Sequence, residues 1–131
     1  MSVAIIGTVA FDTIETPVGK RERILGGSAT FSGIAASLYD DVSLISIVGE
    51  DFEDENFKIF HDHGIDISGI SRVPGKTFHW KGYYTGDMNQ AHTVQTDLNV
   101  LMEFDPIVPE RVRESEIVFL ANIHPVLQKK A

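Results

Sequence analysis

Three short and nearly continuous apolar runs constrain what this chain can fold into: VAIIG at residues 3–7, VSLISIV at residues 42–48 and IVFLA at residues 117–121. They are rich in β-branched side chains and lack the alternation of polar and apolar residues that marks a half-exposed strand. Such runs are typical of strands buried on both faces of a parallel sheet. The chain is therefore expected to form an α/β fold built on a parallel core sheet.

Two helices are predicted after the first two strands. The first has an apolar stripe at helical spacing that should face the sheet, formed by Phe31, Ile34, Ala35 and Leu38. Strand, helix and strand in this order make a βαβ unit. The second helix is expected to begin at Asp51, whose carboxylate can cap free N–H groups, and to end at Gly64, which suits a left-handed stop.

Two segments are too polar to belong to the core sheet. Residues 13–25 follow the first strand, and residues 70–99 are polar and aromatic, with Gly75, Gly82 and Gly86 as turn points. Both are expected to form short, exposed antiparallel strands. One small β-layer that acts as a lid over the ligand-binding edge of the sheet accounts for both inserts, and two unrelated surface loops fit the spacing equally well.

Composition restricts the class of protein further. A length of 131 residues suffices for one domain or part of one. No apolar run approaches the roughly 20 residues that span a bilayer, and no secretory leader is recognisable, so a cytoplasmic location without membrane contact is expected. The absence of cysteine excludes disulfides and thiolate chemistry. A net charge of -8 repels a phosphate backbone, so nucleic acid is not an expected partner.

The last segment is typical of an unfinished sheet. Residues 117–121 form a core-type strand, and the following NIHPVLQKKA is typical of the start of another helix. Three core strands make a partial, doubly wound sheet with at least one strand edge left to pair. We expect residues 1–131 to be the amino-terminal portion of a single larger domain.

Three residues predict a ligand site. Gly26 and Gly27 stand directly before the first helix, where glycine lets a ligand approach the backbone and the helix start offers N–H donors. Asp12 follows the first strand, at the edge where parallel sheets bind ligands, and a carboxylate can accept both hydroxyls of a sugar diol. Without a ligand, the glycines could simply form a tight turn and Asp12 could cap its own turn. The expected convergence of Asp12 with Gly26 and Gly27 favours a ligand site.

Other motifs are absent or ambiguous. Neither GxGxxG after the first strand nor GxxxxGK[ST] occurs, which disfavours dinucleotide and P-loop sites. His61, Asp62 and His63 point in different directions on a helix, so no metal site is predicted. Alternation puts three aromatic residues on one face, where they can stack on a sugar or base, meet a partner subunit or hold the β-layer together: Phe78, Trp80 and Tyr84.

A series of motifs resembles the amino-terminal half of the ribokinase-like (PfkB) sugar and nucleoside kinases. In order they are GTVAFD, a polar insert, GGSATFSGIAASL, VSLISIVGEDF followed by HGID, and a second insert that ends on LNV. The resemblance covers almost the whole chain. It implies a doubly wound α/β domain with a small β-sheet lid, a homodimer formed through that lid, and an enzyme that uses ATP and magnesium to phosphorylate a sugar or nucleoside.

The resemblance also implies roles for single residues. By position, Asp12, Gly26 and Gly27 bind substrate hydroxyls, and Asn99, where the second insert returns to the core, is a further substrate-binding candidate. The acidic residue Asp51, which follows Glu50 after the second core strand, is expected to be structural.

Two departures from the family pattern affect the expected function. Ser28 and Phe31 stand where ribokinases carry Lys and Asn, so either the substrate has a less polar portion or Phe31 turns into the core. The GAGD signature, which supplies the anion hole and the catalytic base, is missing, and so is the segment that binds ATP and magnesium.

We therefore expect the substrate-binding half of a kinase that phosphorylates a hydroxymethyl group, with the catalytic residues outside residues 1–131. A non-catalytic sugar-binding or dimerisation module is the main alternative. An unrelated Rossmann-like regulator is weakened by the missing glycine fingerprint.

Overall fold

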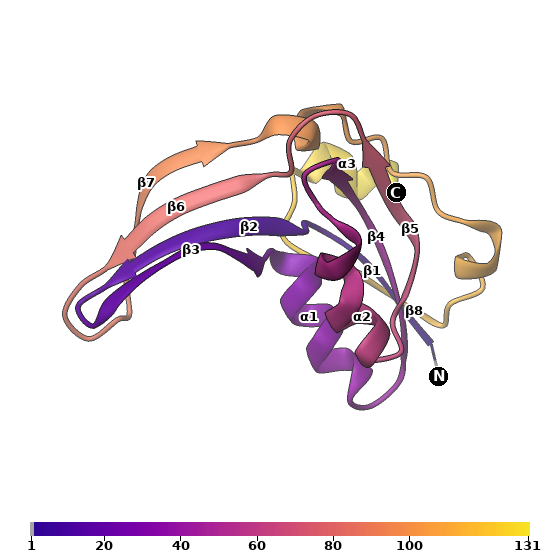
Figure 1. The fold of residues 1–131 in the computed structure, drawn as a ribbon. Coiled ribbons are helices and arrows are strands. Elements are labelled where there is room, and N and C mark those ends of the chain that lie inside the picture. Colours follow the sequence, from indigo (N-terminus) through magenta and orange to yellow (C-terminus); the bar gives the residue numbers. More distant parts are fainter. Residues whose placement is uncertain (1) are drawn as a thin grey trace.

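Two four-stranded sheets organise residues 2–131, the part of the chain that the computed structural model describes (Figure 1). The core sheet has the strand order β5-β4-β1-β8, and the lid sheet has the order β3-β2-β6-β7. The elements follow one another as β1 Ser2–Ile6, β2 Ala10–Thr16, β3 Gly19–Gly26, α1 Ser28–Ser37, β4 Asp41–Gly49, η1 Asp54–Phe57, α2 Lys58–Asp62, β5 Asp66–Val73, β6 His79–Tyr84, β7 Ala91–Asp97, η2 Asn99–Glu103, η3 Glu110–Val112, β8 Ile117–Leu120 and α3 Pro125–Lys130.

The core sheet is parallel throughout. Strands β1, β4 and β8 coincide with the three apolar runs, which confirms the predicted α/β fold. Strand β5 is a correction, because residues 70–73 were assigned to the second insert and belong instead to the core sheet. Its sequence, DISGISRV, mixes polar with apolar residues since the strand lies at the sheet edge and is only partly covered.

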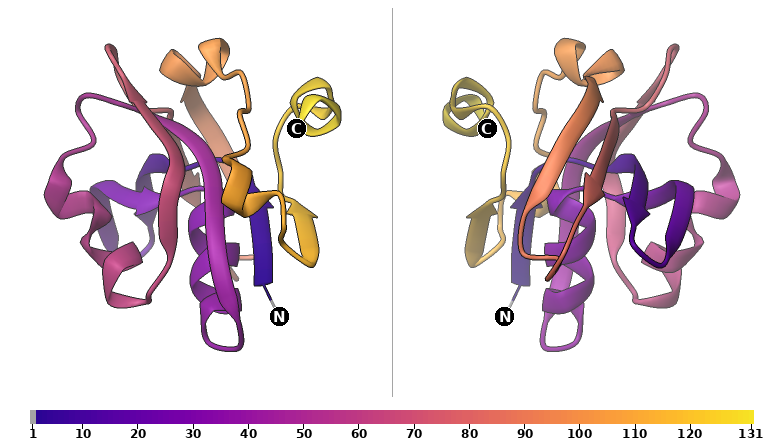
Figure 2. Two further views of the ribbon diagram at one scale, coloured as in Figure 1. Left: turned by 90° about the vertical axis from the view of Figure 1, so that its right-hand side faces the viewer. Right: turned by 90° about the vertical axis from the view of Figure 1, so that its left-hand side faces the viewer.

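Helices and turns cover both faces of the core sheet (Figure 2). Helices α1 and α2 lie against one face, where Ile5, Leu44 and Phe60 are almost completely buried. The turns η2 and η3 and helix α3 lie on the other face, around Ile6 and Ile45. Burial on both faces explains why these strands are apolar at consecutive positions.

Helix α1 packs against the sheet mainly through small residues, and only part of the predicted apolar stripe reaches the core. Phe31 is 63% exposed and Leu38 is 70% exposed, whereas Ala29, Thr30 and Gly33 are buried. A Cβ added to Gly33 would lie 2.8 Å from Cδ2 of Leu44 on β4. The stripe prediction was wrong for Phe31 and Leu38, because the helix lies close to the sheet at Gly33, whereas Ile34 of the stripe is partly buried and packs against the core.

The segment after β4 also differs from prediction. Helical structure begins at the 3-10 turn η1 and continues into the short helix α2, so no helix begins at Asp51. The Asp51 carboxylate accepts hydrogen bonds from Thr77 instead. Gly64 follows the helix with φ +67°, which agrees with its predicted role as a left-handed stop.

The two inserts form one β-layer, which extends away from the core sheet as a curved ribbon (Figure 1). Strand β2 pairs with β6, which joins the insert before α1 to the insert after β5. The reading as two unrelated loops is therefore wrong. The β2–β3 and β6–β7 pairs are antiparallel as predicted, but the central β2–β6 pair is parallel.

One edge of the core sheet carries exposed apolar side chains. All four residues of β8 are between 43% and 58% exposed, although their apolar sequence predicts a buried core strand. No strand among residues 2–131 pairs with the outer edge of β8. Within the same residues, no helix combines the length and the apolar character needed to cross a bilayer.

Candidate functional site

Asp12 and Gly26 meet at the root of the lid. Asp12 lies in β2, opposite Ile24 of β3, and its carboxylate lies against the Cα atom of Gly26, so closely that a Cβ added there would overlap Oδ2. Glycine at position 26 thus makes room for the carboxylate. The sequence prediction that Asp12 and the glycine pair converge agrees with this contact.

A β-bulge lies beside Asp12. The register between β2 and β3 shifts between Asp12 and Ile14, and Arg23 on β3 has φ +51°. The backbone N–H of Arg23 donates to Oγ1 of Thr13 at 3.3 Å. The bulge adds one residue to β3 opposite the step from Asp12 to Ile14, and bulges near sites redirect side chains.

The Asp12 carboxylate is half-buried and unpaired. Burial raises the pKa of Asp12 above its ordinary value of 3.8, and the nearby charge of His79 opposes part of that rise. No hydrogen-bond donor among residues 2–131 contributes to this pKa. A partly desolvated carboxylate without a partner is available to accept hydrogen bonds from a ligand.

Gly27 belongs to the start of α1, but part of the helix start is already occupied. Gly27 is the N-cap with φ +102°, and a Cβ there would overlap the carbonyl of Thr8. Thr8 accepts from two N–H groups of the first turn: its Oγ1 from Ser28 and its carbonyl from Ala29, both at 2.9 Å. Thr8 was not predicted as a site residue. Its position directly after a core strand and Gly7 is the only local feature that indicates a role at the helix start.

Ser28 and Phe31 occupy the two positions that depart from the ribokinase pattern. The hydroxyl of Ser28 donates to the carbonyl of Asn122 at 2.9 Å and accepts from the N–H of Thr8 at 3.1 Å, so it ties the loop after β1 to the loop after β8. Phe31 does not turn into the core, because its side chain is largely exposed. The structure thus rules out the explanation that Phe31 turns into the core, and a less polar portion of the substrate stays a prediction.

Asn99 also lies at the root of the lid, just after β7 ends at Asp97, the register partner of His79. It has φ +51°, and its side-chain amide donates to the carbonyl of Thr77 at 3.0 Å. This bond fixes the amide against the segment that leads into β6. No contact between Asn99 and Asp12 is recorded in the described residues, and a role for Asn99 in substrate binding stays a prediction.

A second aspartate, Asp51, holds the hinge between core and lid. Its Oδ1 accepts from the N–H and from the hydroxyl of Thr77, at 2.8 Å and 2.6 Å, and its Oδ2 lies 3.6 Å from Arg23 of β3. The Thr77 hydroxyl in turn accepts from the N–H of Gly49 at 2.9 Å. Asp51 therefore connects the end of β4 with both lid inserts, in agreement with the structural role expected for it.

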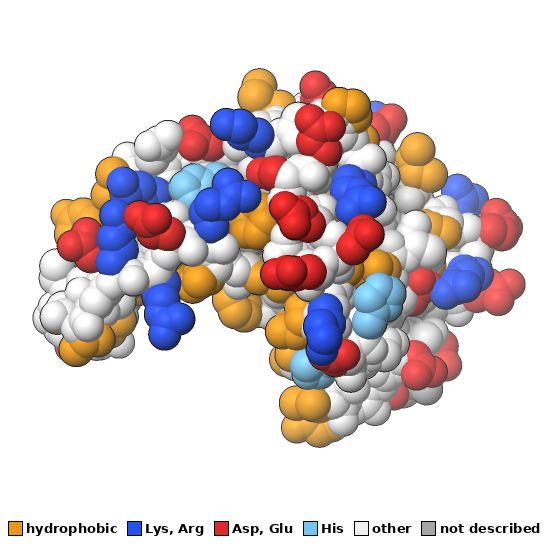
Figure 3. Space-filling view, viewed as in Figure 1, with side chains coloured by type: hydrophobic (Ala, Val, Ile, Leu, Met, Phe, Trp, Pro, Cys, Tyr) orange, Lys and Arg blue, Asp and Glu red, His pale blue; other side chains and the backbone are white. Residues whose placement is uncertain are grey.

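The two faces of the lid sheet differ in chemistry. Trp80 is the register partner of Asp12, so both side chains project from the same face. The opposite face carries Thr13, which bonds the ring Nε2 of His79 at 2.8 Å, and the cation of Arg23, which lies over the ring of Phe11. Charged side chains gather along the lid face that Figure 3 shows.

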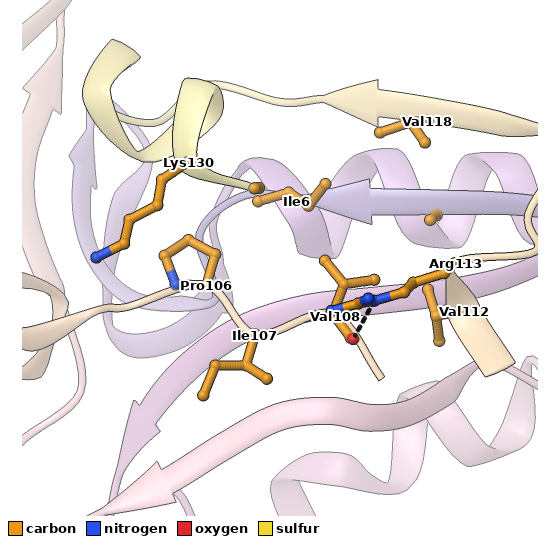
Figure 4. A pocket seen from close by; sticks show the side chains of 10 residues that line it. Ile6, Pro106, Ile107, Val108, Val112, Arg113, Val118 and Lys130 are labelled. Carbon is orange, nitrogen blue, oxygen red and sulfur yellow. Dashed lines mark hydrogen bonds between the residues drawn. The ribbon is translucent and has the colours of Figure 1, made fainter. Parts of the chain in front are cut away.

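Two cavities lie away from these residues. A cavity of about 430 Å³ lies between the core sheet and the chain that precedes β8 (Figure 4), and another of about 520 Å³ lies between η2 and α3. Both are lined mainly by apolar side chains, and Lys130 at the first is paired with Asp105 at 2.7 Å. Neither cavity has Asp12, Gly26, Gly27 or Asn99 in its wall. Such apolar cavities lack the convergent polar groups of a ligand site.

Comparison with known proteins shows which class of protein has this fold. No protein-family model matches the chain. The structure resembles the nucleoside kinase of Methanocaldococcus jannaschii, an archaeal member of the ribokinase family, with a TM-score of 0.74 and 21% identity over 99% of this chain and 48% of that chain. It also resembles the fructokinase of Halothermothrix orenii, with a TM-score of 0.68 and 18% identity over 92% of this chain and 46% of that one. The chain thus has the ribokinase-like fold.

Sequence similarity points to one relative in particular. The cytidine kinase of Thermococcus kodakarensis is 30% identical over 131 residues, which are 99% of this chain and 46% of that protein. The chain spans about half the length of the relatives it matches. The resemblance to half of a ribokinase-like kinase that the sequence predicted is confirmed, and these relatives are kinases.

Proposed function

We propose that the protein is an ATP-dependent kinase that phosphorylates a hydroxymethyl group of a nucleoside or sugar, and that residues 1–131 hold the acceptor. One observation carries this proposal: the Asp12 carboxylate lies half-buried and unpaired against Gly26, at the root of a lid, in a chain with the ribokinase-like fold. The sequence similarity to a cytidine kinase supports a nucleoside as the acceptor.

In this proposal Asp12 orients the acceptor. Its two oxygens accept hydrogen bonds from a pair of neighbouring hydroxyls, and the absence of a side chain at Gly26 lets the sugar approach. Gly27 places the start of α1 beside the same hydroxyls. Asn99 contributes through the backbone it fixes at Thr77. Holding the acceptor in one orientation is the part of phosphoryl transfer that these residues supply.

The phosphoryl donor is proposed to bind outside these residues. ATP with magnesium supplies the transferred group and neutralises its charge. No group of three His, Asp or Glu side chains able to hold a metal ion occurs within residues 2–131, and the sequence has no phosphate-binding GxxxxGK[ST] motif. The residues present therefore do not fit the nucleotide.

We further propose a cytoplasmic homodimer that associates through the lid. The lid sheet supports this proposal because its outer strands, β3 and β7, are not paired on their far sides by any strand among residues 2–131. Sedimentation of the protein at several concentrations tests it. A single species with the mass of one chain at all concentrations contradicts the dimer.

A non-catalytic acceptor-binding module is the second candidate. It is supported by the same contact of Asp12 with Gly26, because these residues can hold an acceptor without supplying a base or an anion hole. The same assay separates the two candidates. The complete natural protein is incubated with ATP and magnesium and with cytidine, inosine or fructose, and phosphorylated product is measured.

We expect phosphorylation of a nucleoside at the hydroxymethyl group. Binding of the same nucleoside without turnover supports the non-catalytic module instead. Neither binding nor turnover with any of the three acceptors contradicts both candidates.

A further inference from the structure

The lid face that carries Asp12 also carries the only tryptophan in the sequence. Trp80 of β6 is the register partner of Asp12 of β2, and the two strands run in parallel. Neighbouring strands are about 4.8 Å apart, so the indole begins one strand away from the carboxylate on the same side of the sheet. A ligand held by Asp12 therefore has Trp80 beside it.

The indole is held in one orientation. Its Nε1–H donates to Oγ1 of Thr93 on β7 at 3.1 Å. Its six-membered ring lies over Gly82, so closely that a Cβ added to Gly82 would overlap Cη2 and Cζ2. Gly82 and Thr93 are register partners across β6 and β7, which places the ring along the face of the sheet rather than upright.

The surroundings of the indole are mixed, with Thr93 and Thr96 of β7 on one side and Ile14 of β2 on the other. Ile14 is the register partner of Gly82, and Ile24 is the register partner of Asp12, so both project from the same face, and Ile24 is 36% exposed. This face thus offers one unpaired carboxylate at the root of the lid and, farther along it, the flat indole ring over Gly82 with Ile14 beside it. It fits a ligand with hydroxyl groups at one end and a planar, weakly polar ring system at the other.

We propose that Trp80 is the residue that selects nucleosides over simple sugars, by stacking on the base of an acceptor whose ribose hydroxyls bind Asp12. The inference rests on the proposed function, because it assumes that Asp12 holds the acceptor. It deepens that function by assigning the base to the lid. Stacking on an indole accepts any base, so Trp80 distinguishes nucleoside from sugar rather than one base from another.

The experiment compares two probes that differ only in the base. Cytidine and methyl β-D-ribofuranoside are titrated into the complete protein, the Trp80→Leu variant and the matched Trp80→Phe variant, which keeps an aromatic face. Dissociation constants are measured by calorimetry, and indole fluorescence is recorded with the Trp80→Phe variant as the background. Thermal melting of each variant identifies any loss of folding.

Trp80→Leu is expected to weaken cytidine binding roughly 5- to 150-fold, the range for removal of one base–aromatic stack, and Trp80→Phe less. Binding of the ribofuranoside should change by less than about twofold, within the range of effects of a residue that the ligand does not touch. Cytidine should quench the Trp80 fluorescence, and the ribofuranoside should not. A Trp80→Leu protein that melts like the wild type and binds cytidine as tightly overturns the proposal, as does unquenched fluorescence at saturating cytidine.

A third variant distinguishes a failure of the role proposed for Trp80 from a failure of the proposed acceptor site. Asp12→Asn should weaken both probes, because the hydroxyls are common to them. If Asp12→Asn has no effect on either probe, the proposed acceptor site itself is wrong. If Asp12→Asn weakens both and Trp80→Leu weakens neither, only the role of Trp80 is wrong.

Discussion

The lid root around Asp12 and the hinge around Asp51 contain the same chemical group in opposite states. Asp51 accepts two hydrogen bonds from Thr77 and lies near Arg23, so its charge is compensated within the fold. Asp12 has burial without compensation, and its pKa is raised accordingly. A paired carboxylate stabilises the structure that contains it, whereas an unpaired one costs stability and is explained by a partner that arrives later. The difference assigns Asp51 to the fold and Asp12 to the ligand.

The largest effect on stability is expected at the hinge. Asp51→Ala removes the acceptor of two hydrogen bonds and leaves the donors of Thr77, which is 1% exposed, without a partner. The free energy of unfolding should fall by about 3 kcal/mol, since bonds to charged groups contribute more than neutral ones. Urea unfolding measures the loss. An unchanged midpoint would show that the Asp51 carboxylate does not stabilise the fold.

Substitutions of the two consecutive glycines should also differ in effect, with one acting mainly on stability and the other mainly on acceptor binding. Gly27→Ala places a Cβ against the Thr8 carbonyl at a positive φ, so it should destabilise the protein by about 2 kcal/mol. Gly26→Ala meets only the end of the Asp12 side chain, which can turn aside. Its stability should change by less than about 1 kcal/mol, but the displaced carboxylate should weaken acceptor binding tenfold to about 100-fold.

Melting temperatures and titration with cytidine compare the two variants directly. The account requires that Gly27→Ala lowers the melting temperature more and that Gly26→Ala weakens binding more. The reverse order for either property contradicts the roles given to the pair.

Among the described residues, the hydroxyl of Thr30 is a second unpaired polar group, but unlike the Asp12 carboxylate it is fully enclosed. The hydroxyl of Thr30 is buried in α1 and has no hydrogen-bond partner among residues 2–131. Unlike Asp12, it belongs to a residue only 2% exposed, so no ligand reaches it without movement of the helix. Thr30→Val should raise the free energy of unfolding by about 1 kcal/mol, because it replaces an unsatisfied polar atom by an apolar one of the same shape. A destabilised variant would show that the hydroxyl has a partner.

The smallest effect is the pH dependence of stability at Asp12. Because the folded-state pKa is raised, folding favours the protonated acid, and this contribution is lost as the pH rises through the raised pKa. At pH 7 the ionised carboxylate is a cost, so Asp12→Asn should melt slightly above the wild type. The gap should close as the pH falls below the ordinary value of 3.8. Calorimetric melts at pH 7 and pH 3 measure both gaps, and a variant that melts lower at pH 7 contradicts an unpaired Asp12.

The elements that could be predicted from the sequence are those whose composition is compatible with only one kind of secondary structure. Continuous β-branched runs gave β1, β4 and β8, and the polarity of two inserts gave the lid. Strand β5 was missed because an edge strand is half-exposed and carries the residues of a loop. The buried face of α1 was misplaced because Gly33 lets the helix approach the sheet, a tertiary effect that helical periodicity does not contain.

The site shows the same limit. The convergence of Asp12 with the glycines followed from the edge at which parallel strands end. Thr8 could not be found, because its bonds to Ser28 and Ala29 cross from one loop to a helix that begins 20 residues later. The pairing of Trp80 with Asp12 depends on β2 and β6 running in parallel, whereas the inserts suggested antiparallel strands.

The most direct test of the central claim is a calorimetric titration of cytidine into the wild type, Asp12→Asn and Asp51→Asn. The account predicts that Asp12→Asn binds about 100-fold more weakly, since two hydrogen bonds to a charged group are lost, and that it melts no lower than the wild type. It predicts that Asp51→Asn melts lower and keeps its affinity within about threefold, because its contacts are made within the fold. Wild-type affinity in Asp12→Asn would contradict the assignment of Asp12 to the acceptor.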